Sequence, residues 1–257
     1  MGLELEPIVT GSDGNFYILN NNNKLYIIEC GIDYKLIIKY LYNKGYLISQ
    51  VQACFISHKH KDHSFCAKSI NRLMPIYSNR QFMEENNFDG KILKPKNIYN
   101  FDDLSVMPIN VEHGSAECYA YMFKTNEKKI LFITDCFKFD EIIKTEFDEI
   151  FIECNWTKEL LMQELERTKD TPQYTKFERQ YQTHMSLDTL KLVLEKSLNL
   201  SKCKKITLIH PSKEVCDKEL ALNELKSLYP DIDIQFAENQ IKGVKNGIQR
   251  IDIFARR

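Results

Sequence analysis

The stretch Ser57-His58-Lys59-His60-Lys61-Asp62-His63 decides how the rest of the chain is interpreted. It contains three of the six histidines in the 257 residues, together with an aspartate. Neutral imidazole and carboxylate are both ligands of divalent metals. The apolar residues 52–56 predict a buried strand before it, and residues 64–73 predict a helix after it. In an extended loop, side chains two apart point the same way, so His58 and His60 can bind one ion while Asp62 and His63 face a second. The alternative is a polar surface loop that is rich in histidine.

Charge and cysteine content restrict the class of protein. The chain has 35 basic and 36 acidic residues and a net charge of −1, so no overall field draws it to nucleic acid or membranes, although a local patch is still compatible with this balance. The eight cysteines include no Cys-x-x-Cys pair, and several lie in predicted strands, which favours a reducing cytoplasm over a disulfide framework. No apolar run approaches the ~20 residues of a membrane span, and the N-terminus lacks the features of a secretion signal. We therefore expect a cytoplasmic protein without a membrane segment.

Hydrophobic periodicity and turn residues predict strands interspersed with helices. Strands are expected at residues 15–20, 24–30, 52–56, 106–111, 119–124, 130–133, 150–154, 206–210, 232–236 and 249–254. Helices are expected at residues 34–42, 64–73, 78–87, 157–167, 187–198 and 218–228. No linker rich in proline, glycine or serine divides the chain, so the simplest interpretation is one domain over residues 1–257. This mixture favours two sheets between helical layers.

Three further candidate ligands stand where predicted strands end. His113 follows the strand at 106–111, Asp135 follows the strand at 130–133, and His210 ends the strand at 206–209. Side chains at strand ends can point into a shared mouth rather than into a core. Each residue alone is more often a satisfied polar group than a ligand.

Together these residues resemble the metal-binding motifs of the metallo-β-lactamase superfamily. Residues 57–63 are similar to its His-x-His-x-Asp-His signature, and the three strand-end residues follow in the order of its later motifs. The resemblance covers most of the chain and implies an α/β (α+β) fold, a four-layer αββα sandwich. It also implies two divalent metal ions, one held by His58, His60 and His113 and the other by Asp62, His63 and His210, with Asp135 bridging them. Zinc suits the imidazole-rich set best, and manganese or iron is the alternative.

Two other segments resemble a bacterial branch that includes single-domain exonucleases and phosphodiesterases. Gly11-Ser12-Asp13-Gly14-Asn15 is similar to its Gly-Ser-x-Gly-Asn turn. His184 stands in a segment similar to its His-Leu-Ser run, and in related phosphodiesterases such a histidine contacts the scissile phosphate or protonates the leaving oxygen. Two departures stand out. In Glu29-Cys30-Gly31, glutamate or cysteine stands where the superfamily usually has a supporting aspartate, and residues 153–157 lack the histidine and aspartate of the branch's Glu-x-Asn-His-Asp run.

The resemblance implies a metal-dependent hydrolase in which two ions activate a water, with Asp62 and His184 as catalytic side chains. We expect a phosphodiester substrate, in a nucleic acid or a (cyclic) nucleotide. Candidate substrate-binding residues are Trp156, Arg179 and Tyr181, because aromatic rings can stack on bases while a cation pairs with phosphate. A core anchor is the alternative for Trp156, and a solvated amphipathic turn for residues 174–181.

Two other functions are compatible with this sequence. One is hydrolysis of a lactone, a thioester or another small ester or amide on the same fold. The other is a scaffold without activity that binds a partner, which the complete ligand set disfavours. A homodimer is a further expectation that the sequence does not decide.

Overall fold

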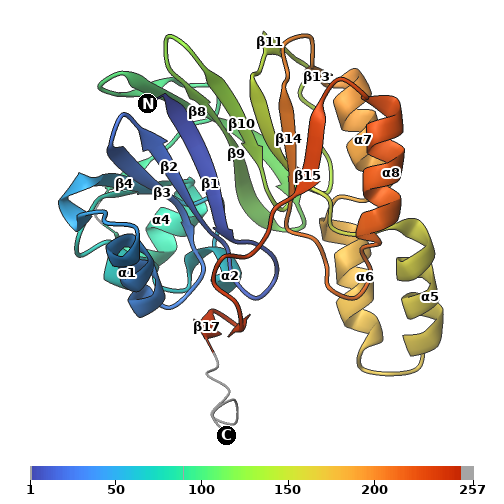
Figure 1. Ribbon diagram of the computed structural model, residues 1–257. Helices are drawn as coiled ribbons and strands as arrows, with labels where there is room; N and C mark the ends of the chain where they lie inside the picture. Colours follow the sequence, from blue (N-terminus) through green and yellow to red (C-terminus); the bar gives the residue numbers. More distant parts are fainter. Residues whose placement is uncertain (1, 89, 250–257) are drawn as a thin grey trace, which may run out of the picture. The chain divides into compact units, whose positions relative to one another are not determined.

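The computed structural model describes residues 2–88 and 90–249 (Figure 1). The chain forms two compact units: unit 1 is Met1–Leu93 with Glu238–Arg257, and unit 2 is Lys94–Ala237. Each unit is built on one large sheet with helices packed against it. The expected single domain over residues 1–257 stays a prediction.

Unit 1 contains a six-stranded sheet whose strands are adjacent in sequence order. They are β1 (Leu3–Val9), β2 (Phe16–Asn21), β3 (Lys24–Cys30), β4 (Val51–Phe55), β5 (Ile76–Ser78) and β6 (Gly90–Ile92). The first three strands are antiparallel, and β3 to β6 run parallel. Asn22 and Asn23 form the turn between β2 and β3, with φ of 51° and 68°. The stretch 57–63 thus follows β4 at the carboxyl end of parallel strands, where open α/β sheets present their sites.

Helices cover one face of this sheet. They are α1 (Tyr34–Asn43), α2 (Lys61–Ser64), α3 (Ala67–Ile70) and α4 (Arg80–Asn86), with a short 3-10 turn, η1 (Ile48–Gln50), before β4. The side chains of Asp33 and Asn79 accept backbone N–H groups and cap α1 and α4. Apolar residues of these helices pack with alternate strand residues in one cluster, among them Ile37, Leu41, Ile70, Phe82, Phe16, Ile18, Leu25 and Ile27. A two-stranded hairpin, β16 (Val244–Lys245) and β17 (Ile248–Gln249), completes the described part of unit 1.

Unit 2 contains a seven-stranded sheet in the order β15-β14-β12-β10-β9-β8-β7. The strands are β7 (Tyr99–Phe101), β8 (Leu104–His113), β9 (Ala116–Lys124), β10 (Lys129–Ile133), β12 (Glu149–Glu153), β14 (Lys205–Ile209) and β15 (Asp233–Phe236). β10, β12, β14 and β15 are parallel, and β8 runs in the same direction because two antiparallel pairings separate it from β10. The carboxyl ends of β8, β10, β12 and β14 therefore meet at one edge, which brings His113, Asp135, Glu153 and His210 to that edge.

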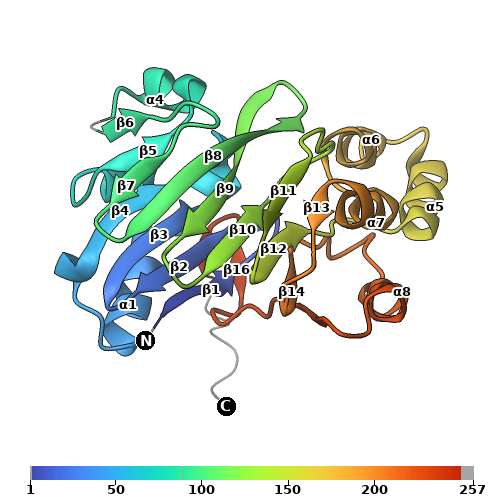
Figure 2. The ribbon, with the colours of Figure 1, turned by 90° about the horizontal axis from the view of Figure 1, so that it is seen from above.

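Four helices complete unit 2, with a small parallel pair, β11 (Ile143–Glu146) and β13 (Leu198–Asn199). The helices are α5 (Lys158–Thr168), α6 (Tyr174–Thr183), α7 (Leu187–Lys196) and α8 (Lys218–Leu228). α7 and α8 lie along the sheet, where Leu190, Leu194 and Leu225 join its hydrophobic cluster (Figures 1 and 2). α5 and α6 pair with each other and share a separate small cluster built on Trp156, Leu161, Phe177 and Val215.

Most predicted elements are confirmed, with three corrections. The helix expected at 64–73 is two short helices, because the carbonyl of Asp62 accepts the Asn15 N–H at 2.7 Å and the N–H of Cys66 donates to Cys30 at 3.0 Å. The aromatic and basic segment 174–181 is helix α6 rather than a turn. Strands β1, β5, β6, β7, β11, β13 and β16 were not expected. The strand expected at 249–254 lies outside the described residues beyond 249. None of the helices in residues 2–88 and 90–249 has the length and apolarity of a membrane span.

Candidate metal centre

The histidine loop of unit 1 places its ligand atoms close together. The Nε2 atom of His58 lies 2.9 Å from Nδ1 of His60, and Nδ1 of His58 lies 2.9 Å from the Ser57 hydroxyl. Asp62 Oδ2 lies 3.5 Å from Nε2 of His63. The rings of His58 and His63 are 4.3 Å apart between centroids, and both side chains are buried. The four side chains of the loop thus lie close together, and their role as metal ligands stays a prediction.

Glu29 supports this loop in place of the usual aspartate. It is the last residue but one of β3, is fully buried, and has a left-handed backbone with φ of 59°. Its carboxylate accepts the Ser57 N–H at 3.1 and 3.3 Å and lies 3.5 Å from Nδ1 of His63. Burial raises the pKa of Glu29, and the neighbouring His63 and Ser57 act in the opposite direction. The longer side chain thus still reaches the histidine loop.

The glycine turn at residues 11–15 also holds His63. The side-chain oxygen of Asn15 accepts the Gly11 N–H at 3.0 Å, and its amide nitrogen lies 3.1 Å from Nε2 of His63. Gly31 passes so close to this loop that a Cβ there would lie 1.6 Å from the Asp62 carbonyl oxygen. Only glycine therefore fits at position 31.

In unit 2, Asp135 presents its two oxygens to two different histidines. Oδ2 lies 3.5 Å from Nε2 of His113, and Oδ1 lies 3.4 Å from Nε2 of His210. All three side chains are about 2% exposed. Asp135 and His210 have left-handed backbones, with φ of 33° and 53°. Such conformations cost about 1–2 kcal/mol and cluster at functional sites.

The protonation of His113 suits a ligand. Its Nδ1 lies 2.7 Å from the carbonyl oxygen of Thr183, which can only accept, so the proton sits on Nδ1 and Nε2 offers its lone pair. Burial lowers the pKa of His113 to about 4, against the opposing effect of Asp135. The ring is therefore neutral near pH 7.

Glu153, the last residue of β12, organises the centre of unit 2 and was not predicted as a site residue. Its Oε2 accepts the N–H groups of Cys136 at 2.7 Å and Met185 at 3.0 Å. Its Oε1 lies 2.7 Å from Nδ1 of His184 and 3.3 Å from Nδ1 of His210. Burial alone would raise the pKa of Glu153, but the charge and hydrogen bond of His184 and the hydrogen bond of His210 lower it to about 2. The signal available in the sequence was a charged residue at the end of the otherwise apolar segment 150–153.

These donor atoms fit divalent metal ions. In unit 2, ligand atoms of Asp135, Glu153, His184 and His210 all lie within 4.8 Å of one another. Two ligands on a tetrahedral zinc with bonds of about 2.0–2.1 Å are about 3.3–3.4 Å apart. The separations of 3.4 and 3.5 Å around Asp135, and of 3.5 Å between Asp62 and His63, are close to that value. The residues present therefore suit a metal of this coordination geometry.

The predicted substrate-binding residues lie on or beside α6. Trp156 is 7% exposed within the α5–α6 cluster, and its Nε1 donates to the His184 carbonyl at 3.1 Å. Its ring lies 5.5 Å from that of Tyr181, which is 46% exposed. Arg179 is exposed one turn before Thr183, whose hydroxyl donates to the Arg179 carbonyl at 2.8 Å. The geometry corresponds to the core-anchor interpretation of Trp156 and leaves Tyr181 as the ring that a base can reach.

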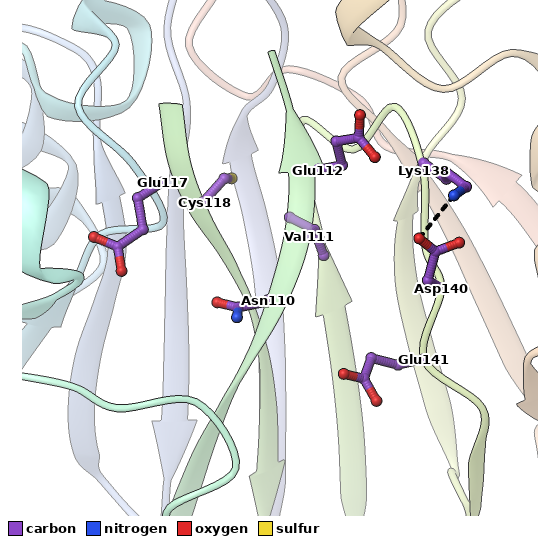
Figure 3. Close-up of a pocket in the computed structure, with 8 residues that line it drawn as sticks. All are labelled: Asn110, Val111, Glu112, Glu117, Cys118, Lys138, Asp140 and Glu141. Carbon is purple, nitrogen blue, oxygen red and sulfur yellow. Dashed lines mark ion pairs between the residues drawn. The ribbon is translucent and has the colours of Figure 1, made fainter. Parts of the chain in front are cut away.

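A pocket of about 410 Å³ opens beside β8 and β9 (Figure 3). Four of its lining residues are acidic, and Lys138 is ion-paired with Asp140 at 2.9 Å. Glu112 and His113 are consecutive in β8, so their side chains point to opposite faces of the sheet. The pocket is lined by Asn110, Val111, Glu112, Glu117, Cys118, Lys138, Asp140 and Glu141. Its carboxylates repel phosphate, so we place no phosphodiester there.

The comparisons with known proteins agree with this fold. Residues 9–73 match the family model of the metallo-beta-lactamase superfamily. The crystal structure of the metallo-beta-lactamase fold protein YhfI from Bacillus subtilis matches 93% of this chain and 97% of its own, with a TM-score of 0.68 at 15% identity. A diphosphatase of the PhnP family matches 94% of this chain and 96% of its own, with a TM-score of 0.63 at 17% identity. The chain is therefore a metallo-β-lactamase-fold protein, and the expected fold class is confirmed.

A curated relative narrows the comparison. The chain is 27% identical over 146 residues to exodeoxyribonuclease YycJ of Bacillus anthracis, which covers 52% of this chain and 55% of the relative. The chain thus spans about half the length of the curated relatives that it matches. This similarity agrees with the resemblance of its motifs to the exonuclease and phosphodiesterase branch.

Proposed function

We propose that this protein is a metal-dependent phosphodiesterase that cleaves a phosphodiester in a nucleic acid or a nucleotide. The observation that carries the proposal is the arrangement around Asp135, where each carboxylate oxygen faces the Nε2 atom of a different histidine at 3.4–3.5 Å. A carboxylate placed in this way can serve two ions at once. That arrangement is typical of enzymes that hydrolyse phosphate esters.

We infer that two ions are held by the ligand set that the motifs imply. His58, His60 and His113 would hold one, Asp62, His63 and His210 the other, and Asp135 would bridge them. Two divalent ions, zinc by the preference of an imidazole-rich set, would supply an activated water and neutralise charge on the phosphate. Asp62, with 25% of its side chain exposed, is the carboxylate of unit 1 that would act on this water.

His184 is the side chain best suited to meet the substrate. Its Nδ1 is held by Glu153 at 2.7 Å, which directs Nε2 away from the carboxylate. Its side chain is 11% exposed, against about 2% for His113 and His210. An imidazole held in this way can bind the scissile phosphate or donate a proton to the leaving oxygen. Glu153 would fix the orientation of the ring.

A nucleic-acid substrate is supported by the similarity to a protein named exodeoxyribonuclease and by the side chains of α6. Arg179 and Tyr181 are exposed on the helix that ends at His184, so a phosphate and a base adjoining the scissile bond would meet a cation and an aromatic ring. The Trp156 ring, which lies beside the Tyr181 ring, would support it by packing. A homodimer and a cytoplasmic location remain predictions, and analytical ultracentrifugation tests the first.

A substrate panel tests the proposal. Purified protein, loaded with zinc or manganese, is assayed with an aryl phosphodiester, cyclic mononucleotides, single- and double-stranded DNA, RNA and a lactone. We expect close to two ions per chain and metal-dependent cleavage of a phosphodiester that Asp135→Ala lacks. Turnover of the lactone alone would establish the alternative hydrolase, and a folded protein that takes up no metal would refute the proposal.

A further inference from the structure

Helix α6 reaches the metal centre of unit 2 through its last turn. The carbonyl of Thr183 accepts Nδ1 of His113 at 2.7 Å. One turn earlier, Nε2 of Gln180 donates to Oδ1 of Asn155 at 2.6 Å. The same helix exposes Arg179 and Tyr181 on either side of Gln180. Arg179 and Tyr181, which suit a substrate, thus adjoin Gln180, which is hydrogen-bonded to Asn155 beside the site.

Asn155 links Gln180 to His210 through its side-chain amide. Its side chain is 3% exposed, and its backbone is fixed by hydrogen bonds to Met185 and from Ser212, both at 2.9 Å. The amide nitrogen Nδ2 donates to the His210 carbonyl at 2.9 Å and lies 3.1 Å from the ring Nδ1. A carbonyl can only accept, so it requires the amide nitrogen on its side. The amide of Gln180 supports that orientation, because its Nε2 donates to the Asn155 oxygen on the other side.

His210 depends on this support. Its backbone is left-handed, with φ of 53°, a conformation that is unfavourable for a residue with a Cβ. The hydrogen bond from Asn155 to its carbonyl offsets part of that cost. With the backbone held, Nδ1 lies 3.3 Å from Glu153 and Nε2 lies 3.4 Å from Asp135. The ring orientation that suits a metal is therefore secured from two directions, by Glu153 and by Asn155.

We propose that Gln180 is a positioning residue that fixes the Asn155 amide and so holds His210 for its metal. The inference rests on the proposed metal centre and adds that α6, the helix with the substrate-facing side chains, sets how tightly His210 is held. Gln180 touches neither metal nor substrate. A substrate that moves α6 would change the position of His210 through the side-chain amides of Gln180 and Asn155.

Two substitutions remove the N–H donor of Gln180 while keeping the length of the side chain. Gln180→Met keeps the length and removes the donor. Gln180→Glu also removes the donor and places a carboxylate against Oδ1 of Asn155, so the amide turns and presents its oxygen to the His210 carbonyl. Gln182→Met is the matched control, since Gln182 is exposed on the same helix. The readout is the stepwise zinc affinity of metal-stripped protein, measured by competition with a chromophoric chelator, with the thermal midpoint recorded for each variant.

We expect Gln180→Met to weaken one of the two zinc-binding steps by about 10-fold and Gln180→Glu by at least as much, because groups that orient a ligand affect metal affinity by about 10–100-fold. Gln182→Met should bind zinc as the parent protein does. Asn155→Ala should show the same loss, and the double variant Asn155→Ala/Gln180→Met no further loss, since both act through one connection.

Parental zinc affinity in both Gln180 variants would overturn the inference, as would additive losses in the double variant or an equal loss in Gln182→Met. These outcomes differ from a failure of the proposed function, in which the parent protein binds two zinc ions and cleaves no phosphodiester. A parent protein that binds no zinc would overturn both.

Discussion

Replacing Glu153 by glutamine should remove the residue that organises the centre of unit 2 while keeping its size. The two backbone N–H groups of Cys136 and Met185 require an oxygen, so the new NH₂ group faces Nδ1 of His184 and of His210. The charge-assisted hydrogen bond to His184 is lost, and such bonds contribute about 1.5–3 kcal/mol. A carboxyl whose pKa falls from 4.5 to about 2 on folding stabilises the native state by about 3 kcal/mol, which agrees with the upper end of that range.

Urea unfolding of metal-free protein measures this effect. Because the folded pKa is below the unfolded one, the stabilisation is fully present above about pH 4.5 and is lost as the pH falls towards about 2. Glu153→Gln should therefore lower the free energy of unfolding by about 3 kcal/mol at pH 7, and the difference from the parent should narrow below about pH 4.5. Glu149→Gln is the matched control, because this residue begins the same strand and forms a partly exposed ion pair with Lys128 at 2.7 Å, for which we expect a loss of about 0–1 kcal/mol. A loss at pH 7 no larger than that of the control would refute the role assigned to Glu153.

Other predictions concern the ligands and His184. Asp135→Ala should abolish phosphodiester turnover and lower the bound metal below two ions per chain, measured by elemental analysis. Full metal content with parental turnover would contradict the bridging role. His184→Ala should retain its metal but reduce turnover by about 10²–10⁴-fold, the usual contribution of a positioned acid or base; an unchanged rate would make His184 structural. Metal-free protein should lose up to about 3 kcal/mol of stability between pH 6.5 and 4, because the unfolded chain binds a proton that buried His113, with a pKa of about 4, does not. His113→Gln should remove this pH dependence in urea unfolding, and a dependence that persists would contradict its assignment to His113.

The sequence predicted the histidine loop and most of the surrounding elements because their signals are local. An apolar run followed by ligands at alternate positions places residues 57–63 after a strand, and β4 ends at Phe55, three residues before His58. The asparagines at positions 21–23 likewise indicate a turn, because asparagine tolerates left-handed backbone conformations. His113, Asp135 and His210 were found by their position at strand ends, which a period-two pattern locates to within a few residues.

The supporting residues were harder to find because their partners are distant in sequence. Glu153 bonds to Cys136 and His184, 17 and 31 residues away, and no local pattern reports such pairings. The break between α2 and α3 has the same origin, since the Asp62 carbonyl that would continue the helix is bound by Asn15. For residues 174–181 the sequence left a substrate-binding segment and an amphipathic turn open, and it did not predict helix α6. The buried residue of this helix, Phe177, clusters with Trp156, Leu161 and Val215, which are distant in sequence.

The left-handed backbones of Glu29, Asp135 and His210 have a consequence for laboratory evolution. Glycine adopts these dihedral angles freely, so a library selected only for protease resistance or heat tolerance should accumulate glycine or asparagine at these three codons. Each such replacement would raise the stability of the protein and remove a functional side chain. A library selected for stability and a library selected for turnover should therefore differ most at these three positions. The positions that differ would identify the active centre even before a substrate is known.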